Sequence, residues 1–466
     1  MFAIPGIIAL VVFIYARPQE FFERLRVVPL LYIFCGLAVF GIVLDLRLGN
    51  SRLRAVPQLP WVALFFVWSA LTVLIRAPST AVEHIISLSI CVTLFVLVAH
   101  GVQSFRALHL LAATVLSMVL FVCSVGVEQG FAEMGCVVVD ESVLGDSASG
   151  KPDGRACVTA RNCYGGDALP GADYQCEHIG WFGTTSIGHG RVRYRGVLQD
   201  PNELALAGGA GLPLAFAFGQ VKKGALGRIL LGVWAFVLVL VCAVLTASRG
   251  GQLVFLAVMA AYCVNRAGIR GLLLGGVLAL PLLLLGGRGG EDASSSTLER
   301  IDCWAEAISM WRSHPLLGVG LGQFNEYHYM TAHNSYLLAL AELGFPGMLL
   351  FGAMLYLSAK IPISALRHMR QASTPEVLAG AELTRAWAVA LIAAFIGLVV
   401  GIFFLSFTYH YVLWIYLGIS GAFYSAVRKH DASFRVRLTG VDLALIAAAN
   451  VAIIVFVFFY TRWKLG

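Results

Sequence analysis

Met330-Thr331-Ala332-His333-Asn334-Ser335 leads directly into a long apolar run and lies within the stretch around which the chain is organised, Leu298 to Phe351. The residues before it form an amphipathic segment and a Gly-rich turn. The run after it, 334–358, is long enough to cross about 30 Å of hydrocarbon as a helix. The sequence therefore predicts a titratable imidazole at the mouth of a membrane helix, where water meets lipid.

The composition predicts that most of the chain lies in a membrane. Hydrophobic residues make up 59% of the 466 residues and charged residues only 13%, with a mean hydropathy of +0.81. Soluble domains are closer to half apolar and a quarter charged. We expect an all-α, polytopic integral membrane protein with about 12–13 transmembrane helices and two periplasmic segments. The predicted spans are 2–16, 27–46, 57–75, 83–99, 106–127, 201–219, 228–247, 250–266, 271–287, 334–358, 386–407, 409–427 and 440–461.

The basic residues predict how these spans are oriented. With the long segments 128–200 and 288–333 on one side, the opposite loops hold seventeen Arg and Lys residues, against seven in the short loops and C-terminus on the same side. Positive charge gathers on the cytoplasmic side of membrane proteins. We therefore expect a multi-pass protein of the bacterial inner membrane whose long segments face the periplasm. The same bias explains the net charge of +7, so no nucleic-acid partner is expected.

The predicted spans divide the chain into five parts. They are N-terminal transmembrane helices at 1–127, a Cys-containing periplasmic loop at 128–200, transmembrane helices with candidate substrate arginines at 201–287, a periplasmic amphipathic helix and turn at 288–333, and C-terminal transmembrane helices at 334–466. In the fourth part, Ser296 and Glu299 form a candidate capping box, and Pro315 ends the helix. Its apolar face suits either the lipid surface or packing beneath a loop.

Four cysteines in the first long segment indicate two disulfides, because an exported loop is an oxidising setting, and three connectivities are possible. They are Cys136, Cys157, Cys163 and Cys176. Zinc is the competing interpretation because His178 and His189 follow. No C-x2-C pair is present, so we favour the disulfides and expect no metal.

Arg195 is the first candidate ligand for a phosphate-bearing substrate. It precedes a predicted helix start in which Asp200 suits the N-cap and Pro201 the first turn, followed by Asn202. A helix N-terminus beside an arginine favours anions. The alternative is an interfacial arginine beside a capping aspartate.

Arg249 and Arg300 are two further outward arginines. Arg249 lies in a very tight turn between two predicted spans, where it opposes the positive-inside trend. A pyrophosphate group, a nearby carboxylate or snorkelling to head groups would each account for it. Arg300 lies on the amphipathic helix, where pairing with Glu299 or Glu306 is the alternative to a substrate role.

His333 is the candidate catalytic base. An imidazole with an ordinary pKa near 6.5 accepts a proton at ambient pH, and Asn334 is placed to cap the following helix. A structural role is the alternative, and His328 and His314 are weaker candidates. Glu342 follows about two and a half helical turns later, inside the span, where an ionisable group needs a partner or a function.

The Gly-rich turn Gly318-Val319-Gly320-Leu321-Gly322 is not a dinucleotide-binding fingerprint. Gln323 stands where the last Gly of that motif belongs, and no strand–helix unit surrounds it. We interpret it as a flexible turn that lets the backbone approach a lipid head group.

Together these motifs resemble the O-antigen ligase and polymerase superfamily. The motifs are Arg195 with Asp200-Pro201-Asn202, Ser248-Arg249-Gly250, Pro315-Leu316-Leu317-Gly318-Val319-Gly320, and His333-Asn334-Ser335-Tyr336-Leu337 with Glu342-Leu343-Gly344. The resemblance covers about 195–350, roughly a third of the chain. It implies a GT-C type membrane glycosyltransferase that works on the periplasmic face without a metal or other cofactor. By position it implies pyrophosphate binding by Arg195 and Arg249, more loosely by Arg300, and catalysis by His333, with Asp200, Asn202 and Asn334 in support.

The resemblance implies that the protein transfers an O-antigen-like glycan from undecaprenyl pyrophosphate to a sugar hydroxyl of lipid A core. Membrane lipids are expected to surround it. The transfer is a ligase reaction of lipopolysaccharide biosynthesis. A polymerase, which uses another repeat unit as the acceptor, is the closest alternative. A flippase or transporter of lipid-linked sugars would predict charges through the membrane midplane and internal repeats, and neither is seen. A sensor or scaffold would leave the outward Arg and His residues unexplained.

Overall fold

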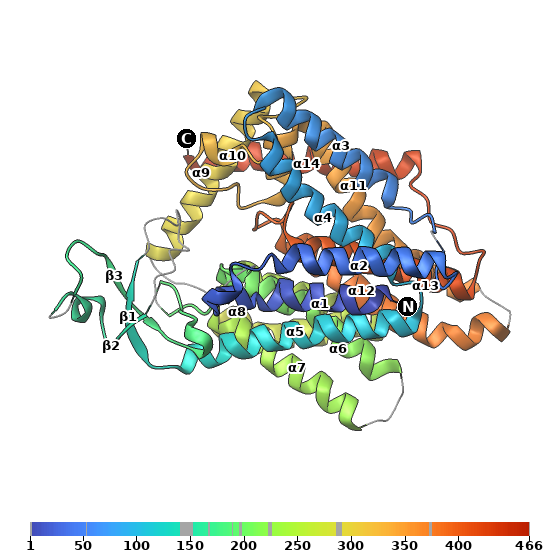
Figure 1. Cartoon of the computed structure of the whole chain (residues 1–466), viewed down its shortest axis with the longest axis horizontal. Helices are drawn as coiled ribbons and strands as arrows, with labels where there is room; N and C mark the ends of the chain where they lie inside the picture. Colours follow the sequence, from blue (N-terminus) through green and yellow to red (C-terminus); the bar gives the residue numbers. More distant parts are fainter. Residues whose placement is uncertain are drawn as a thin grey trace. The chain divides into compact units, whose positions relative to one another are not determined.

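The computed structural model of the chain describes residues 2–52, 54–139, 152–165, 168–188, 190–194, 198–221, 226–285, 291–371 and 375–465. They form two compact units. Unit 1 comprises Met1–Leu10, Tyr32–Ala112 and Gly289–Gly466, and unit 2 comprises Val11–Leu31 and Ala113–Arg288. Helices dominate both units (Figure 1), which confirms the predicted all-α membrane class. The division into five parts stays a prediction.

The elements follow the apolar runs of the sequence. The helices are α1 (Ala3–Ala16), α2 (Leu30–Arg47), α3 (Leu59–Arg76), α4 (Ala81–Gly101), α5 (Phe105–Phe131), α6 (Pro201–Val221), α7 (Leu226–Leu245), α8 (Arg249–Leu285), α9 (Glu291–Ser313), α10 (Phe324–Tyr327), α11 (Ser335–Gln371), α12 (Pro375–Gly401), α13 (Tyr411–His430) and α14 (Gly440–Leu465). The strands are β1 (Met134–Val138), β2 (Pro152–Ala156) and β3 (Tyr174–His178). Short 3-10 turns occupy Pro18–Glu20, Glu23–Leu25, Ala160–Tyr164 and Trp181–Gly183.

Ten helices among the described residues are long and apolar enough to cross a membrane, against the thirteen spans predicted. Neither α6 nor α13 is among these ten helices. The predicted spans 250–266 and 271–287 both lie on α8, which is interrupted at Gly268 (φ 60°). The chain is a multi-pass membrane protein, with fewer clear spans than a count of apolar runs suggests.

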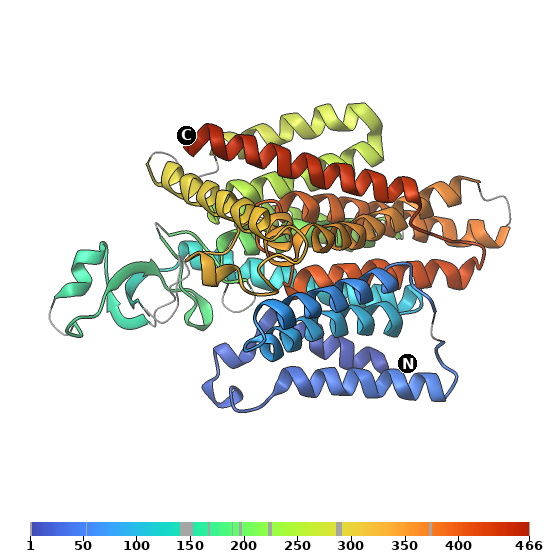
Figure 2. The same ribbon diagram turned by 90° about the horizontal axis from the view of Figure 1, so that it is seen from above.

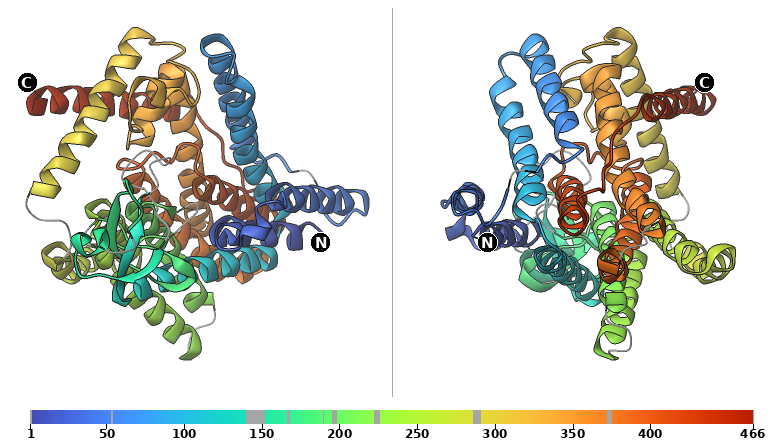
Figure 3. Two further views of the ribbon diagram at one scale, coloured as in Figure 1. Left: turned by 60° about the vertical axis from the view of Figure 1, so that its left-hand side comes forward. Right: turned by 90° about the vertical axis from the view of Figure 1, so that its right-hand side faces the viewer.

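The centre of unit 1 is α13, which is buried without interruption from Val412 to Val427. It packs against α4, α11 and α12. Glycine permits the close approach of α4, because a Cβ at Gly418 would lie 2.7 Å from Cβ of Val98. Helices α3 and α4 pack side by side (Figure 3) and extend the unit.

The predicted amphipathic helix is present as α9. It begins at Glu291, so the predicted capping box is wrong: Ser296 lies inside the helix, not before it. Figure 2 shows α9 lying along α14, and it also packs against α11. The Trp304 ring is 5.5 Å from that of Phe403. The apolar face of α9 is thus used for packing within unit 1, which favours the packing interpretation over one at the lipid surface.

Helix α11 is broken at Gly344 (φ 68°), and the preceding Gly-rich turn lies against the break. The N–H of Gly320 donates to the carbonyl of Glu342 at 2.9 Å. A Cβ at Gly318 (φ 63°) would lie 2.4 Å from the carbonyl oxygen of Glu342, and one at Gly344 would lie 2.1 Å from that of Leu316. The prediction of a flexible turn at 318–322 is therefore wrong, because these glycines allow the turn to pack against α11.

In unit 2, α6 packs against α7 and α8. Glycines on α6 let α5 approach it: a Cβ at Gly211 would lie 2.8 Å from the Val119 side chain, and one at Gly208 would lie 3.1 Å from Sγ of Cys123. Beyond the C-terminal end of α5 the chain forms a small antiparallel sheet of order β2-β1-β3 (Figure 1).

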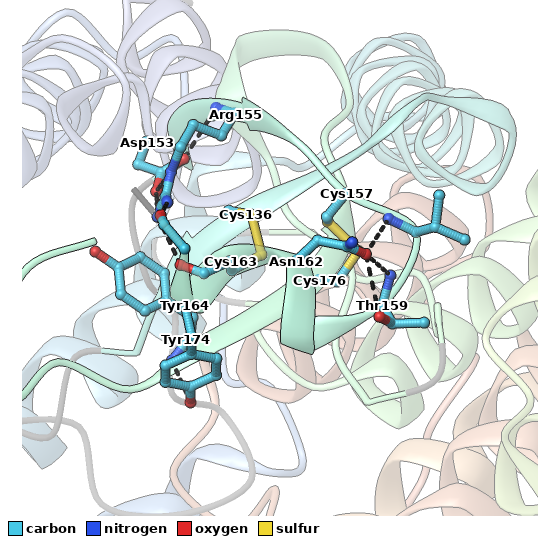
Figure 4. The surroundings of a disulfide bond; sticks show 12 residues. Cys136, Asp153, Arg155, Cys157, Thr159, Asn162, Cys163, Tyr164, Tyr174 and Cys176 are labelled. Carbon is cyan, nitrogen blue, oxygen red and sulfur yellow. Dashed lines mark hydrogen bonds and ion pairs between the residues drawn. A yellow bond between two sulfur atoms is a disulfide. The ribbon is translucent and has the colours of Figure 1, made fainter. Parts of the chain in front are cut away.

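The sheet is held by two disulfides (Figure 4). Cys136 pairs with Cys163 and Cys157 pairs with Cys176, which is one of the three connectivities that the sequence allowed. In these bonds the four sulfurs are not thiolates, so the zinc interpretation loses its cysteine ligands. His189, its other candidate ligand besides His178, lies outside the described residues.

Arg155 on β2 links this strand to the 3-10 turn that contains Cys163. Its guanidinium donates to Asp153 Oδ2 at 2.6 Å and to the carbonyl of Cys163 at 2.9 Å, and it lies over the Tyr174 ring, 5.0 Å from its centroid. Figure 4 shows these side chains gathered on one edge of the sheet. Against the opposing effect of burial, the bonds from Arg155 lower the pKa of the Asp153 carboxyl. The sheet is therefore a rigid module in which covalent and ionic links replace a large core.

We predict that Gly318→Ala destabilises the protein. A left-handed backbone costs a non-glycine residue about 1–3 kcal/mol, and the added methyl would also overlap the Glu342 backbone. Thermal unfolding in detergent, followed by tryptophan fluorescence, should show a clear drop in midpoint. Gly380→Ala on α12 is the matched control, because nothing lies within 4 Å of its added Cβ. Equal midpoints for the two variants would contradict the prediction.

Candidate functional site

The candidate residues are divided between the two units. Asp200, Asn202 and Arg249 belong to unit 2, whereas Arg300, His333 and Asn334 belong to unit 1. Arg195 lies outside the described residues.

Asp200 caps α6 as the sequence predicted. Its Oδ1 accepts a hydrogen bond from the N–H of Asn202 at 2.6 Å. Glu203 reaches back, and its Oε2 accepts from the N–H of Asp200 at 3.3 Å, which completes a reciprocal capping arrangement. The first turn of α6 is thus saturated by its own carboxylates.

Ser248 caps α8 in the same way and joins the two helix ends. Its Oγ accepts from the N–H of Gly251 at 2.8 Å and donates to Oδ1 of Asn202. Ala247 before it takes a left-handed conformation (φ 46°), which turns the chain sharply from α7 into α8. Arg249 is therefore the first residue of α8, and it is exposed between the buried Ser248 and Gly250. The sequence placed Arg249 in a tight turn, and this arrangement explains how the turn is held.

Two buried arginines beside this turn were missed by the sequence analysis. Arg191 Nε donates to the carbonyl of Thr246 at 3.1 Å, so its guanidinium braces the α7–α8 turn. Arg193 Nε donates to the carbonyl of Thr185 at 3.0 Å. Buried arginines are rare because desolvation is costly. The available signal was the alternation Arg191-Val192-Arg193-Tyr194-Arg195, which places three arginines on one side of an extended segment.

The helix ends themselves have little anion-binding capacity left. The N–H of Asn202 is taken by Asp200, and that of Gly251 by Ser248. A helix N-terminus binds anions through such donors, so the predicted contribution of the α6 end is weaker than the sequence suggested. The role of Arg249 in binding a phosphate group stays a prediction.

In unit 1, His333 lies in a left-handed turn (φ 47°) directly before α11 and is half-buried. Asn334 caps the helix as predicted, because its Oδ1 accepts from the N–H groups of Tyr336 at 3.0 Å and Leu337 at 3.1 Å. A non-glycine residue in this conformation is uncommon, and such outliers gather at functional sites.

The residues on both sides of His333 are bound to the segment between α12 and α13. Ser335 donates through Oγ to the carbonyl of Leu405 at 2.6 Å and accepts there from the N–H of Phe407 at 2.7 Å. Thr331 Oγ1 donates to Ser406 Oγ at 2.9 Å. The backbone of His333 is therefore held before any substrate arrives.

Glu342 is buried and accepts hydrogen bonds from the Gly-rich turn, α10 and Tyr409. Its Oε1 accepts from the N–H of Phe324 at 3.1 Å, and its Oε2 accepts from the hydroxyl of Tyr409 at 2.8 Å. The carboxylate thus ties α10 and the start of α13 to α11. This is a structural reason for the ionisable group that the sequence placed inside a span.

His328 braces the segment before His333. Its Nδ1 lies 3.1 Å from the backbone nitrogen and 3.0 Å from the carbonyl oxygen of Met330, and its Nε2 lies 3.1 Å from Asp302 Oδ2 on α9. Cys303 lies 3.8 Å from the same Nδ1, but burial raises the pKa of its thiol to about 12. The cluster links α9 to the segment before His333 through the contact of His328 with Asp302.

Arg300 is half-buried on α9, near its middle. It lies two residues before Asp302, whose bond to His328 links α9 to the segment that leads to His333.

Comparison with known proteins points to one family. Residues 234–352 match the family model described as O-antigen ligase. The matched segment contains Arg249, Arg300 and His333 and excludes Arg195 and Asp200. No curated protein shows significant similarity to the chain. The match supports the resemblance to the O-antigen ligase superfamily over residues 234–352, about a quarter of the chain.

We predict that Ser248→Ala destabilises the helix ends of unit 2. The change removes the cap of α8 and leaves Asn202 Oδ1 without its Ser248 donor, and loss of a cap alone costs about 0.5–2 kcal/mol. Ser248→Thr, which keeps the hydroxyl, should retain most of the stability. The midpoint of thermal unfolding in detergent measures both variants. A Ser248→Ala protein as stable as the Thr variant would rule out this link.

Proposed function

We propose that this chain, a membrane protein of the O-antigen ligase superfamily, transfers an O-antigen-like glycan from undecaprenyl pyrophosphate to a sugar hydroxyl of lipid A core. The reaction would take place on the periplasmic face of the inner membrane. The observation that carries the proposal is the family match at 234–352, which contains both Arg249 and His333. His333 also has the constrained backbone expected of a functional residue.

The leaving group sets the first chemical requirement. The bond between the anomeric carbon of the donor sugar and the pyrophosphate oxygen breaks, and the electron pair leaves with the lipid pyrophosphate. Negative charge therefore builds on that group in the transition state. A fixed guanidinium stabilises such charge, which is the role proposed for Arg249 and, outside the described residues, for Arg195. Arg300 is a further candidate for the same charge.

The acceptor hydroxyl sets the second requirement. Its oxygen forms the new bond to the anomeric carbon while its proton passes to a base, and we assign this proton to the imidazole of His333. Asn334 supports the assignment, because its buried Nδ2 has no hydrogen-bond partner among the described residues. An acceptor or donor sugar oxygen would satisfy that donor.

The proposed chemistry uses no metal. Arginine supplies the positive charge that a divalent cation supplies in other phosphate-leaving reactions. The test below therefore includes a chelator, and loss of transfer on adding it would contradict this part of the proposal.

We predict that Arg249→Ala and His333→Ala each reduce glycan transfer by about a hundredfold or more, because each removes transition-state stabilisation or proton transfer. The assay uses the purified full-length protein, a lipid pyrophosphate-linked glycan, a chelator, and lipid A core as the acceptor. Arg249→Lys should recover part of the activity, since it keeps the charge and loses the bidentate geometry.

Matched controls lie in the same parts of the chain. Arg270→Ala removes an exposed arginine from the other half of α8, and His430→Ala removes an exposed histidine at the end of α13. Both should transfer normally. Near-normal transfer by Arg249→Ala and His333→Ala would remove the mechanism.

The choice of acceptor separates the ligase from a polymerase. A parallel reaction offers a second lipid-linked repeat unit instead of lipid A core. We expect transfer to lipid A core. Transfer only to the second repeat would assign the chain to polymerisation with the same chemistry.

A further inference from the structure

Three arginines converge at the end of unit 1 where α3 begins and α13 ends. Arg52 and Arg54 precede α3, and Arg428 lies in the last turn of α13. Arg54 Nη1 donates to the carbonyl of Ser425 at 2.8 Å. Residues three apart share one face of a helix, so Arg54 is held beside Arg428.

None of the three guanidinium groups is paired with a carboxylate of the described residues. Burial, and then the charges of Arg428 and Arg52, lower the pKa of Arg54, although an arginine remains charged at any physiological pH. Within the parts of the chain that the structure describes, no carboxylate forms an ion pair with any of the three. Like charges brought together in this way cost free energy unless an anion joins them.

Arg428 has an unmet hydrogen bond as well. Its Nε is buried and has no hydrogen-bond partner among the described residues, while its guanidinium lies over the Tyr424 ring, 5.8 Å from the centroid. A buried donor without an acceptor is expensive. An oxygen acceptor at this point would relieve it.

Asp431, the acidic residue closest in sequence to Arg428, interacts with other residues. Asp431 follows Arg428 by three residues, but its carboxylate accepts from Ser433 Oγ at 2.5 Å and lies 2.7 Å from Nε2 of His368. Arginines are common on the cytoplasmic side of membrane proteins, which explains why Arg52, Arg54 and Arg428 occur here. That trend does not explain why the three lie close together. Arg435 and Arg437, for example, satisfy the same trend while exposed to solvent.

We propose that Arg52, Arg54 and Arg428 bind the phosphate of an anionic phospholipid head group. Guanidinium groups bind phosphate oxygens in pairs, and basic clusters at the cytoplasmic ends of membrane helices are suited to such lipids. Helix α3 is long and apolar enough to cross a membrane, so we expect its start near the head groups, and it exposes Leu64 and Val67, a surface along which acyl chains can lie. By the predicted orientation, the lipid comes from the inner leaflet.

The test is lipid binding to the purified full-length protein, measured by native mass spectrometry in detergent. Phosphatidylglycerol is the probe, phosphatidylcholine the neutral comparison, and inorganic phosphate the competitor. We expect retained phosphatidylglycerol on the wild type. The double variant R54Q/R428Q should bind it about tenfold or more weakly, and R54K/R428K should keep most of the binding.

R435Q/R437Q is the matched control, because it removes the same charge from exposed positions. If R435Q/R437Q weakens phosphatidylglycerol binding as much as R54Q/R428Q does, the weakening reflects general surface charge, and the proposed site is overturned. Equal retention of phosphatidylcholine, or displacement of phosphatidylglycerol by inorganic phosphate at similar concentration, would overturn a lipid head-group site. If R54Q/R428Q does not fold, the single variant R428Q is measured by the same criterion. Glycan transfer is not the readout, so the outcome is separate from that of the proposed function.

Discussion

The break of α11 at Gly344 is the constraint on which unit 1 depends. Inside a membrane, backbone groups that a helix releases must find partners in the protein, because no water replaces them. Several of these groups have partners: the carbonyls of Ala341 and Glu342 accept from the N–H groups of the Gly-rich turn, and that of Leu343 accepts from Trp68 Nε1 at 2.8 Å. On the other side, the N–H of Phe345 donates to the carbonyl of Pro315 at 3.0 Å. The turn and the broken helix are therefore one structural unit.

The break leaves only a short part of α11 directly after His333. The segment from Ser335 to Leu343 is a half-helix fixed at both ends, by the loop 402–408 at its start and by the turn and Trp68 at its end. Glu342 adds a third fixed point through Tyr409. Acid–base chemistry requires a precisely placed side chain, so these hydrogen bonds fit the role proposed for His333.

Local chemistry explains what the sequence could predict. The apolar runs gave helices because hydrocarbon leaves the backbone no other choice, and Asp200 and Asn334 were identified as caps because capping depends on adjacent residues. The break at Gly344, the start of α9 before Ser296 and the buried Arg191 were missed. Each of these is decided by contacts between segments far apart in the sequence. The disulfide pairing was open for the same reason, since spacing alone does not say which cysteines face each other.

The state of the helix ends decides what can hold an anion in unit 2. If the N–H groups of α6 and α8 were open, they would provide a phosphate site with no need for arginine. Asp200 and Ser248 occupy them instead, and the hydrogen bond from Ser248 to Asn202 locks the two ends together. The two helix ends are thus linked to each other, and Arg249, the first residue of α8, is exposed beside this link. Charge that builds on a leaving group is best stabilised by a donor that is already held in place, so the role proposed for Arg249 fits its position as the first residue of α8 on these linked helix ends.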